Sequence, residues 1–143
     1  MDKKTVVTGT IGEDAHMVAT QLLSYALEKA GFNVECLGAR VPQEEFIDAA
    51  IESNAVAILV SSLYGHGILD IEGFRDKCVE AGLKDILLYI GGILTPGGME
   101  TADGKGCEAI EARVKEIGFN RFYGPDANLE EAIADLKKDL GIS

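Results

Sequence analysis

The sequence predicts an α/β protein whose five parallel strands form one doubly wound sheet. Two observations support this fold class. Strand-like and helix-like segments alternate along the 143 residues, which is typical of a parallel sheet with helical crossovers. Segment 56–60 is apolar at every position, as expected of a strand that helices cover on both faces. The length favours a single domain spanning residues 1–143.

Hydrophobic periodicity places the elements along the chain. Strands are expected at residues 5–11, 33–37, 56–60, 86–90 and 121–123. Helices are expected at residues 17–30, 42–53, 69–81, 107–117 and 129–140. Right-handed crossovers and the size of the chain favour the Rossmann-like (flavodoxin-like) strand order 2-1-3-4-5. The loops after the strands therefore meet at the carboxyl edge of the sheet, where such folds bind ligands.

Apolar faces and helix-end residues support the helices. One face of the first helix carries Val18, Leu22, Tyr25 and Ala26. Pro42 is typical of the first turn of the second helix. Three glycines fit the position just after a helix end, namely Gly31, Gly82 and Gly118. The spacing of Asn128 and Glu131 is that of a capping box at the start of the last helix.

Composition excludes several classes of protein. The net charge of −11 argues against a nucleic-acid partner, which requires a basic face. No long apolar run exists, so no membrane span is expected. The first residues are too polar for a signal peptide, and the odd count of three cysteines, with no C-x-x-C pair, argues against a disulfide framework. A reducing cytoplasm is therefore expected.

The first loop at the carboxyl edge carries a carboxylate and an imidazole. Asp14 and His16 lie between strand 5–11 and helix 17–30. A carboxylate beside a histidine can accept one ring N–H and leave the other nitrogen free for a metal. Taken singly, Asp14 fits a helix N-cap equally well, and His16 fits a solvated loop residue. Their position in this loop favours a ligand site.

Two more loops, 61–67 and 91–98, are expected at the same edge. Their glycines allow the backbone to approach a ligand closely. Hydroxyl groups would come from Ser61 and Ser62, and apolar contacts from Leu63, Ile93 and Leu94. This mixture suits a large, mostly apolar ligand with polar substituents.

Other ligand classes fit these loops poorly. The phosphate-loop pattern is absent, because Gly106 follows Gly104-Lys105. The dinucleotide pattern G-x-G-x-x-G is absent after the first strand. A receiver domain needs an acceptor aspartate at the end of the third strand, where this chain has Ser61 and Ser62.

Three motifs together resemble the signature of the cobalamin-binding domains, D-x-H-x-x-G…S-x-L…G-G. They are Asp14-x-His16, Ser61-x-Leu63 and Gly91-Gly92, and Ala19 replaces the signature glycine. The resemblance extends over nearly the whole chain. It implies a Rossmann-like domain in which the histidine replaces dimethylbenzimidazole as the lower cobalt ligand. The displaced nucleotide tail then lies in a deep slot beside the sheet.

Within that family, the chain is most similar to the small (sigma) subunits of glutamate mutase. Segments 60–65, 86–92 and 133–140 carry this closer match, whereas Thr95-Pro96 is similar to the cobalamin domain of methylmalonyl-CoA mutase. The resemblance implies an adenosylcobalamin-binding isomerase subunit that interconverts L-glutamate and threo-3-methylaspartate. The alternatives are the small subunit of an acyl-CoA mutase and a non-catalytic corrinoid carrier or sensor.

The resemblance also implies roles for single residues. His16 would be the cobalt ligand, Asp14 would accept its other ring N–H, and Ser61 would bind the benzimidazole. The implied cofactor-binding residues are Glu13, Asp14, Ala15, His16, Met17, Ser61, Ser62, Leu63, Gly91, Gly92, Ile93, Leu94, Thr95, Pro96 and Gly97. The chain would carry no catalytic residue besides the cobalt ligand. Its four arginines are scattered, so no site for a substrate with two carboxylates is expected on it.

A second subunit follows from the same resemblance. The substrate would bind to a large barrel-type catalytic subunit, joined with this chain in a heterotetramer and required for activity. Tyr64 and His66 are the candidate contacts with that subunit, since both residue types combine apolar contact with hydrogen bonding.

Overall fold

The structure is a computed structural model of the chain. It describes residues 3–12, 16–63, 65–92, 94, 104–124 and 127–142, and the side chains of 104–107 are not among the described parts.

Five parallel strands form one sheet with the order β2-β1-β3-β4-β5, which confirms the predicted topology. The strands are β1 (Thr5–Thr10), β2 (Asn33–Cys36), β3 (Ala57–Ser62), β4 (Leu87–Gly92) and β5 (Arg121–Tyr123). Their bounds lie within one or two residues of those expected. Strands β1 and β3 are almost entirely buried, and β4 is buried at 88–90, as expected of strands that helices cover on both faces.

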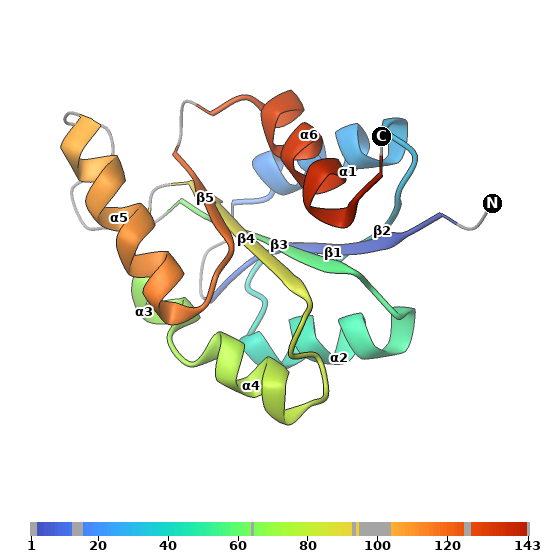
Figure 1. Cartoon of the computed structure of the whole chain (residues 1–143), viewed down its shortest axis with the longest axis horizontal. Coiled ribbons are helices and arrows are strands. Elements are labelled where there is room, and N and C mark those ends of the chain that lie inside the picture. Colours follow the sequence, from blue (N-terminus) through green and yellow to red (C-terminus); the bar gives the residue numbers. More distant parts are fainter. Residues whose placement is uncertain are drawn as a thin grey trace.

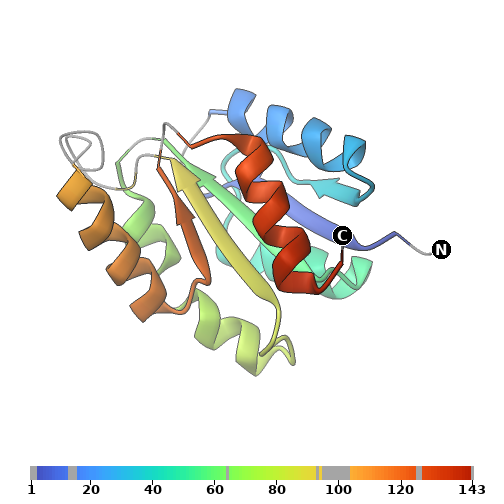
Figure 2. The ribbon, with the colours of Figure 1, turned by 45° about the horizontal axis from the view of Figure 1, so that its top comes forward.

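Helices cover both faces of the sheet (Figure 1). They are α1 (Val18–Lys29), α2 (Gln43–Ser53), α3 (Gly67–Ile71), α4 (Phe74–Glu80), α5 (Gly104–Ile117) and α6 (Leu129–Leu140). Helices α1 and α6 lie on one face, and the other four lie on the opposite face (Figures 1 and 2). The sheet is therefore doubly wound, as predicted. No helix in the described parts of the chain has the length and apolarity that a membrane span requires.

The helix expected at residues 69–81 is wrong as a single element. Glu72 has an extended backbone with ψ 132°, and Gly73 has φ +77°, so the chain breaks into α3 and α4 there. Glycine adopts this left-handed conformation without strain. The Gln43 side chain stabilises the break, because its Nε2 donates hydrogen bonds to the carbonyls of Asp70 and Glu72. The hydrophobic periodicity of residues 69–81 could not predict this contact with a side chain from another helix.

The apolar face predicted for the first helix is largely exposed. Val18, Leu22 and Tyr25 have exposed fractions of 69%, 55% and 60%. The buried residues of α1 are Thr20, Leu23, Ser24 and Leu27. Polar residues are buried because the hydroxyls of Thr20 and Ser24 pair with threonine hydroxyls of β1. The spacing of apolar residues therefore predicted the wrong buried face for α1.

Three glycines and Asn128 lie at the helix ends where they were predicted, whereas Pro42 is the N-cap of α2 and not part of its first turn. Gly31, Gly82 and Gly118 have φ values of +101°, +87° and +116° after α1, α4 and α5. The Asn128 side chain caps α6 by accepting the N–H of Glu130 at 2.7 Å.

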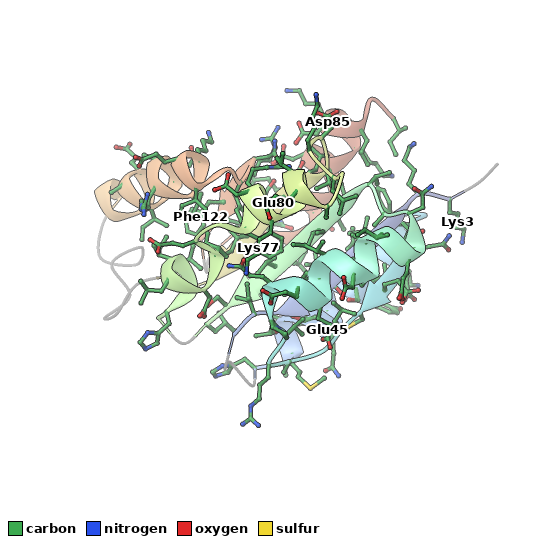
Figure 3. The ribbon with its side chains drawn as sticks, turned by 90° about the horizontal axis from the view of Figure 1, so that it is seen from below. Lys3, Glu45, Lys77, Glu80, Asp85 and Phe122 are labelled. Carbon is green, nitrogen blue, oxygen red and sulfur yellow. The ribbon has the colours of Figure 1, made fainter. Side chains whose placement is uncertain are left out.

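The two faces of the sheet are packed differently. The face under α2 to α5 contains a large core in which Phe74 contacts both Phe46 and Phe119, with ring centroids 5.9 and 5.5 Å apart. Charged side chains such as Glu45 and Lys77 lie outside this layer (Figure 3). The core under α1 and α6 is smaller and centres on Leu27, Tyr89 and Leu136. A cavity with mostly apolar walls lies on this second face.

Candidate functional site

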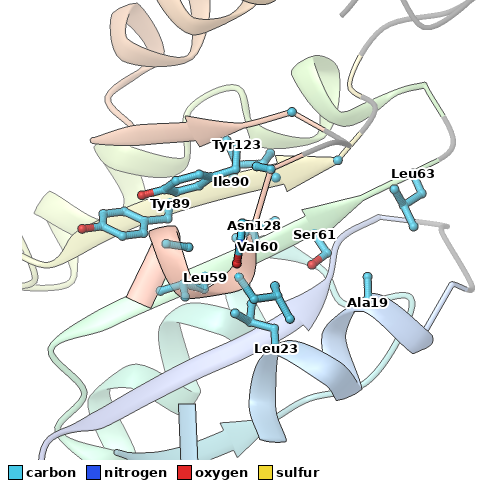
Figure 4. A pocket seen from close by; sticks show the side chains of 16 residues that line it. Ala19, Leu23, Leu59, Val60, Ser61, Leu63, Tyr89, Ile90, Tyr123 and Asn128 are labelled. Atoms are coloured by element: carbon cyan, nitrogen blue, oxygen red, sulfur yellow. The ribbon is translucent and has the colours of Figure 1, made fainter. Parts of the chain in front are cut away.

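A cavity of about 320 Å³ lies between α1 and α6, above β3 and β4 (Figure 4). Its walls are mostly apolar. Ala19 and Leu23 belong to α1, whereas Leu59, Val60 and Ser61 belong to β3 (Figure 4). The remaining lining residues are Leu63, Tyr89, Ile90, Gly91, Gly92, Tyr123, Gly124, Ala127, Asn128, Leu129 and Ala132. The position matches the slot that the sequence resemblance implies, beside the sheet and near its carboxyl edge.

One row of paired residues crosses the sheet at the end of the cavity. Thr10 of β1 pairs with Ser61 of β3, Ser61 pairs with Gly91 of β4, and Gly91 pairs with Tyr123 of β5. Ser61 and Gly91 both line the cavity. Because Gly91 has no side chain, the sheet surface beside the Ser61 hydroxyl stays open.

Gly92 is required for a different reason. Its φ is +117°, and a Cβ atom at this position would lie 2.0 Å from the carbonyl oxygen of Ser62. No other residue type fits such a close approach of two backbones. The two glycines therefore have separate roles: Gly91 leaves space over the sheet, and Gly92 permits the turn at the strand end.

The two predicted serines lie on opposite faces of the sheet. Ser61 lines the cavity, but Ser62 is fully buried under Gly67 of α3. Within the described residues, the Ser62 hydroxyl has no hydrogen-bond partner. Leu63 lines the cavity, whereas Leu94 packs in the core on the α3 side. The period-2 alternation of a strand explains this separation.

His16 and Met17 lie directly before α1 and are exposed. The backbone of His16 is held by a hydrogen bond of 2.6 Å from the Thr10 hydroxyl to the His16 carbonyl. His66, the second histidine, is exposed directly before α3, on the other face of the sheet. The predicted residues Glu13, Asp14, Ala15, Ile93, Thr95, Pro96 and Gly97, and the candidate contact Tyr64, lie outside the described residues.

Sequence reasoning missed a charged cluster behind the cavity. Tyr89 and Tyr123 donate their hydroxyl hydrogens to Asp139 and Asp135 of α6, the second at 2.7 Å. Arg121 binds Asp139 through two hydrogen bonds of 2.8 and 2.9 Å. It also lies 3.6 Å from Asp135. The spacing of the two aspartates, four apart in a helix, was visible in the sequence, but their partners were not.

Electrostatics in this cluster favour the ionised carboxylate. The hydrogen bonds from Arg121, and to a smaller degree from Tyr89, lower the pKa of Asp139 from 3.8 to about 2 against the opposing effect of partial burial. Burial, followed by hydrogen bonding to a carboxylate, raises the pKa of the Tyr89 and Tyr123 hydroxyls. The tyrosines therefore act as neutral hydrogen-bond donors, and their rings form one wall of the cavity.

Comparison with known families agrees with this geometry. The B12 binding domain family matches residues 4–119, which include both β1 and the Gly91-Gly92 turn. The chain therefore belongs to the B12-binding domain family.

Individual relatives narrow the comparison. The chain is 50% identical to the glutamate mutase sigma subunit of Clostridium tetani and 51% identical to that of Clostridium cochlearium. Both alignments cover 99% of this chain and 99% of the relative. Among solved structures, a cobalamin-binding protein from Desulfitobacterium hafniense has a TM-score of 0.72 and 20% identity over 94% of this chain and 58% of that one. At this identity the structural likeness concerns the fold alone.

Proposed function

We propose that this chain is the adenosylcobalamin-binding small subunit of a glutamate mutase, an isomerase that works with a separate large subunit. The observation that carries the proposal is the 50% identity to glutamate mutase sigma subunits over 99% of both chains. Because the alignment covers 99% of the relative, the likeness extends over its length and is not limited to the fold.

The volume and lining of the described cavity support a site for the nucleotide tail of cobalamin. Its volume of about 320 Å³ lies within the range of small-molecule sites. Apolar walls suit a benzimidazole ring, and the Ser61 hydroxyl supplies a polar group of the kind that fixes the orientation of such a ring. Ala19 lines this cavity, so its methyl group, which replaces the glycine of the family signature, reduces the space but leaves the cavity open.

The residues of this chain would bind and orient the cofactor. His16 would hold cobalt, Asp14 would fix the tautomer of the imidazole, and Ser61 would bind the tail. When bound, adenosylcobalamin supplies radical chemistry through its weak cobalt–carbon bond. The loops at the carboxyl edge would exclude water from the reacting groups once a large barrel-type subunit, in a heterotetramer, covers them.

Replacing His16 tests the cobalt assignment directly. With ¹⁵N-labelled histidine, the electron paramagnetic resonance spectrum of bound Co(II) cobalamin should show a histidine ¹⁵N superhyperfine coupling. His16→Ala should remove that ¹⁵N coupling. The chain has two histidines, so His66→Ala is a matched control and should keep the coupling. Unchanged coupling in the His16 variant, or its loss in the His66 variant alone, would contradict the assignment.

Turnover measurements test the substrate and the partner. The purified chain should have no mutase activity alone and should isomerise glutamate when a glutamate-mutase-type barrel subunit is added. Activity on methylmalonyl-CoA instead would indicate an acyl-CoA mutase. Cobalamin binding without turnover alongside an active barrel subunit would indicate a carrier or sensor. Isomerisation by the chain alone would refute the two-subunit proposal.

A further inference from the structure

Four buried hydroxyl groups connect β1 to α1 in two pairs. Thr8 pairs with Ser24 and Thr10 pairs with Thr20, each at 2.8 Å between oxygens. The exposed fractions of the four residues lie between 0% and 7%. The pairs are chemically alike, and they differ in what each contacts next.

Counting hydrogens fixes the direction of each pair, because a hydroxyl group has one hydrogen to donate. Thr10 donates its hydrogen to the His16 carbonyl at 2.6 Å, so Thr20 must donate to Thr10. Ser24 donates its hydrogen to the Thr20 carbonyl at 2.8 Å, so Thr8 must donate to Ser24. The first chain of hydrogen bonds ends outside the helix, at His16. The second ends within α1.

The backbone of Thr10 is itself firmly held. Its N–H donates to the Gly38 carbonyl at 2.8 Å, and its carbonyl accepts the N–H of Val41 at 2.9 Å. On the other side Thr10 pairs with Ser61 in the sheet. A hydroxyl on so constrained a residue transmits the position of the sheet to the residue that it binds.

We infer that Thr10 is a positioning residue for His16, with Thr20 as its hydrogen-bond donor. This inference rests on the proposed function, in which His16 is the cobalt ligand and Ser61 contacts the tail. Thr10 neighbours Ser61 and binds His16. It therefore fixes the spacing between the cobalt ligand and the cavity, which a cofactor spanning both must match. A positioning residue of this kind affects where the His16 imidazole lies relative to cobalt. It does not change the basicity of the imidazole.

A matched pair of substitutions separates this role from general packing. Thr10→Val and Thr8→Val keep the size of the side chain and remove one buried hydroxyl each, but only the first removes the bond to His16. Thr10→Val should weaken binding of Co(II) cobalamin about 10-fold, at the lower end of the range for loss of an outer contact of a metal ligand. It should also reduce the fraction of bound cobalamin with histidine nitrogen coupling. Thr8→Val should leave the affinity for Co(II) cobalamin and the fraction with histidine coupling within about twofold of the unmodified protein. Changes at sites that share no direct partner usually affect each other only this little.

Two further variants test whether misfolding, rather than the lost bond to His16, explains weaker cobalamin binding by Thr10→Val. Thr10→Ser keeps the hydroxyl and should restore binding. Thr20→Val leaves the bond from Thr10 to His16 but removes the donor behind it, so it should give an effect between those of Thr8→Val and Thr10→Val. If Thr10→Val does not fold, a Thr20→Val protein that binds no worse than Thr8→Val overturns the inference. Binding is compared at a temperature where circular dichroism shows every variant folded.

The outcomes separate the positioning role of Thr10 from the assignment of His16 as the cobalt ligand. Equal binding and equal nitrogen coupling in Thr10→Val and Thr8→Val would overturn the positioning role while His16→Ala still loses its coupling. Unchanged coupling in His16→Ala would instead overturn the cobalt assignment and, with it, the inference.

Discussion

The two helices that flank the cavity are attached to the sheet by opposite kinds of chemistry. Helix α1 is held by neutral hydroxyl pairs to β1 and by apolar packing through Leu23 and Leu27. Helix α6 is held by a charged cluster around Arg121 and by apolar packing through Leu136. These α1 contacts contain no ionisable group, whereas the α6 cluster depends on ionised carboxylates, so acid and salt should loosen the α6 wall before the α1 wall.

The attachments also differ in where they lie. The hydroxyl chain reaches His16, at the carboxyl edge of the sheet. The charged cluster binds Asp135 and Asp139, whereas the residues of α6 that line the cavity, Leu129 and Ala132, come earlier in the helix. One wall is therefore fixed at the expected cobalt end, and the other is fixed behind the slot.

The largest effect is expected from the apolar attachment of α1. Leu27 is fully buried, so Leu27→Ala should lower the free energy of unfolding by about 3 kcal/mol through lost burial and a residual cavity. Leu22 is 55% exposed, and Leu22→Ala should change it by less than about 0.5 kcal/mol. Urea unfolding followed by circular dichroism measures both. A larger effect at Leu22 would mean that the face predicted from the sequence is the buried one.

The next effect concerns the α6 wall. Arg121→Met removes the cation from two carboxylates and should destabilise the fold by about 2 kcal/mol, the scale of charge-assisted hydrogen bonds. Because the cavity loses a firm wall, cobalamin should bind less tightly, while cobinamide, which lacks the nucleotide tail, should bind as before. Titration of both corrinoids, followed by absorbance, gives the two affinities. Equal losses for both would argue against a role of α6 in holding the tail.

A smaller effect is expected from one hydroxyl in the same cluster. Tyr123→Phe removes the hydrogen bond to Asp135 but keeps the ring that lines the cavity. The free energy of unfolding should fall by about 1 kcal/mol, as for a typical hydrogen bond. Tyr25→Phe is the control, because Tyr25 is 60% exposed on α1 and should have no measurable effect. Thermal unfolding of both variants at pH 7 would check the difference.

The smallest effect is the dependence on pH. The folded protein holds the pKa of Asp139 at about 2, below its ordinary value of 3.8. This carboxylate therefore stabilises the fold fully above pH 4 or so, and its contribution is lost as pH falls from 3.8 towards 2. Asp139→Asn should reduce the fall in melting temperature across that interval. An identical fall in the variant would assign the acid sensitivity to other groups.

The sequence was sufficient for the sheet order and for placing Ser61 and Gly91 side by side at the carboxyl ends of β3 and β4. Parallel strands and right-handed crossovers leave few arrangements, so local patterns were enough to predict the topology. The buried face of α1 was missed because hydroxyl pairs such as Thr10 with Thr20 replace apolar contacts there. The Arg121 cluster was missed because its partners are 12 to 50 residues apart in the chain. Only tertiary structure brings such groups together.

Helix α6 follows every described strand of the sheet in the sequence. Leu129 and Ala132 complete the cavity, and both belong to α6. A nascent chain that stops before residue 129 already contains every strand of the sheet, together with His16 and Ser61. It lacks one side of the slot, because Leu129 and Ala132 are not yet part of it. The slot is consequently complete only when α6 has packed on the sheet.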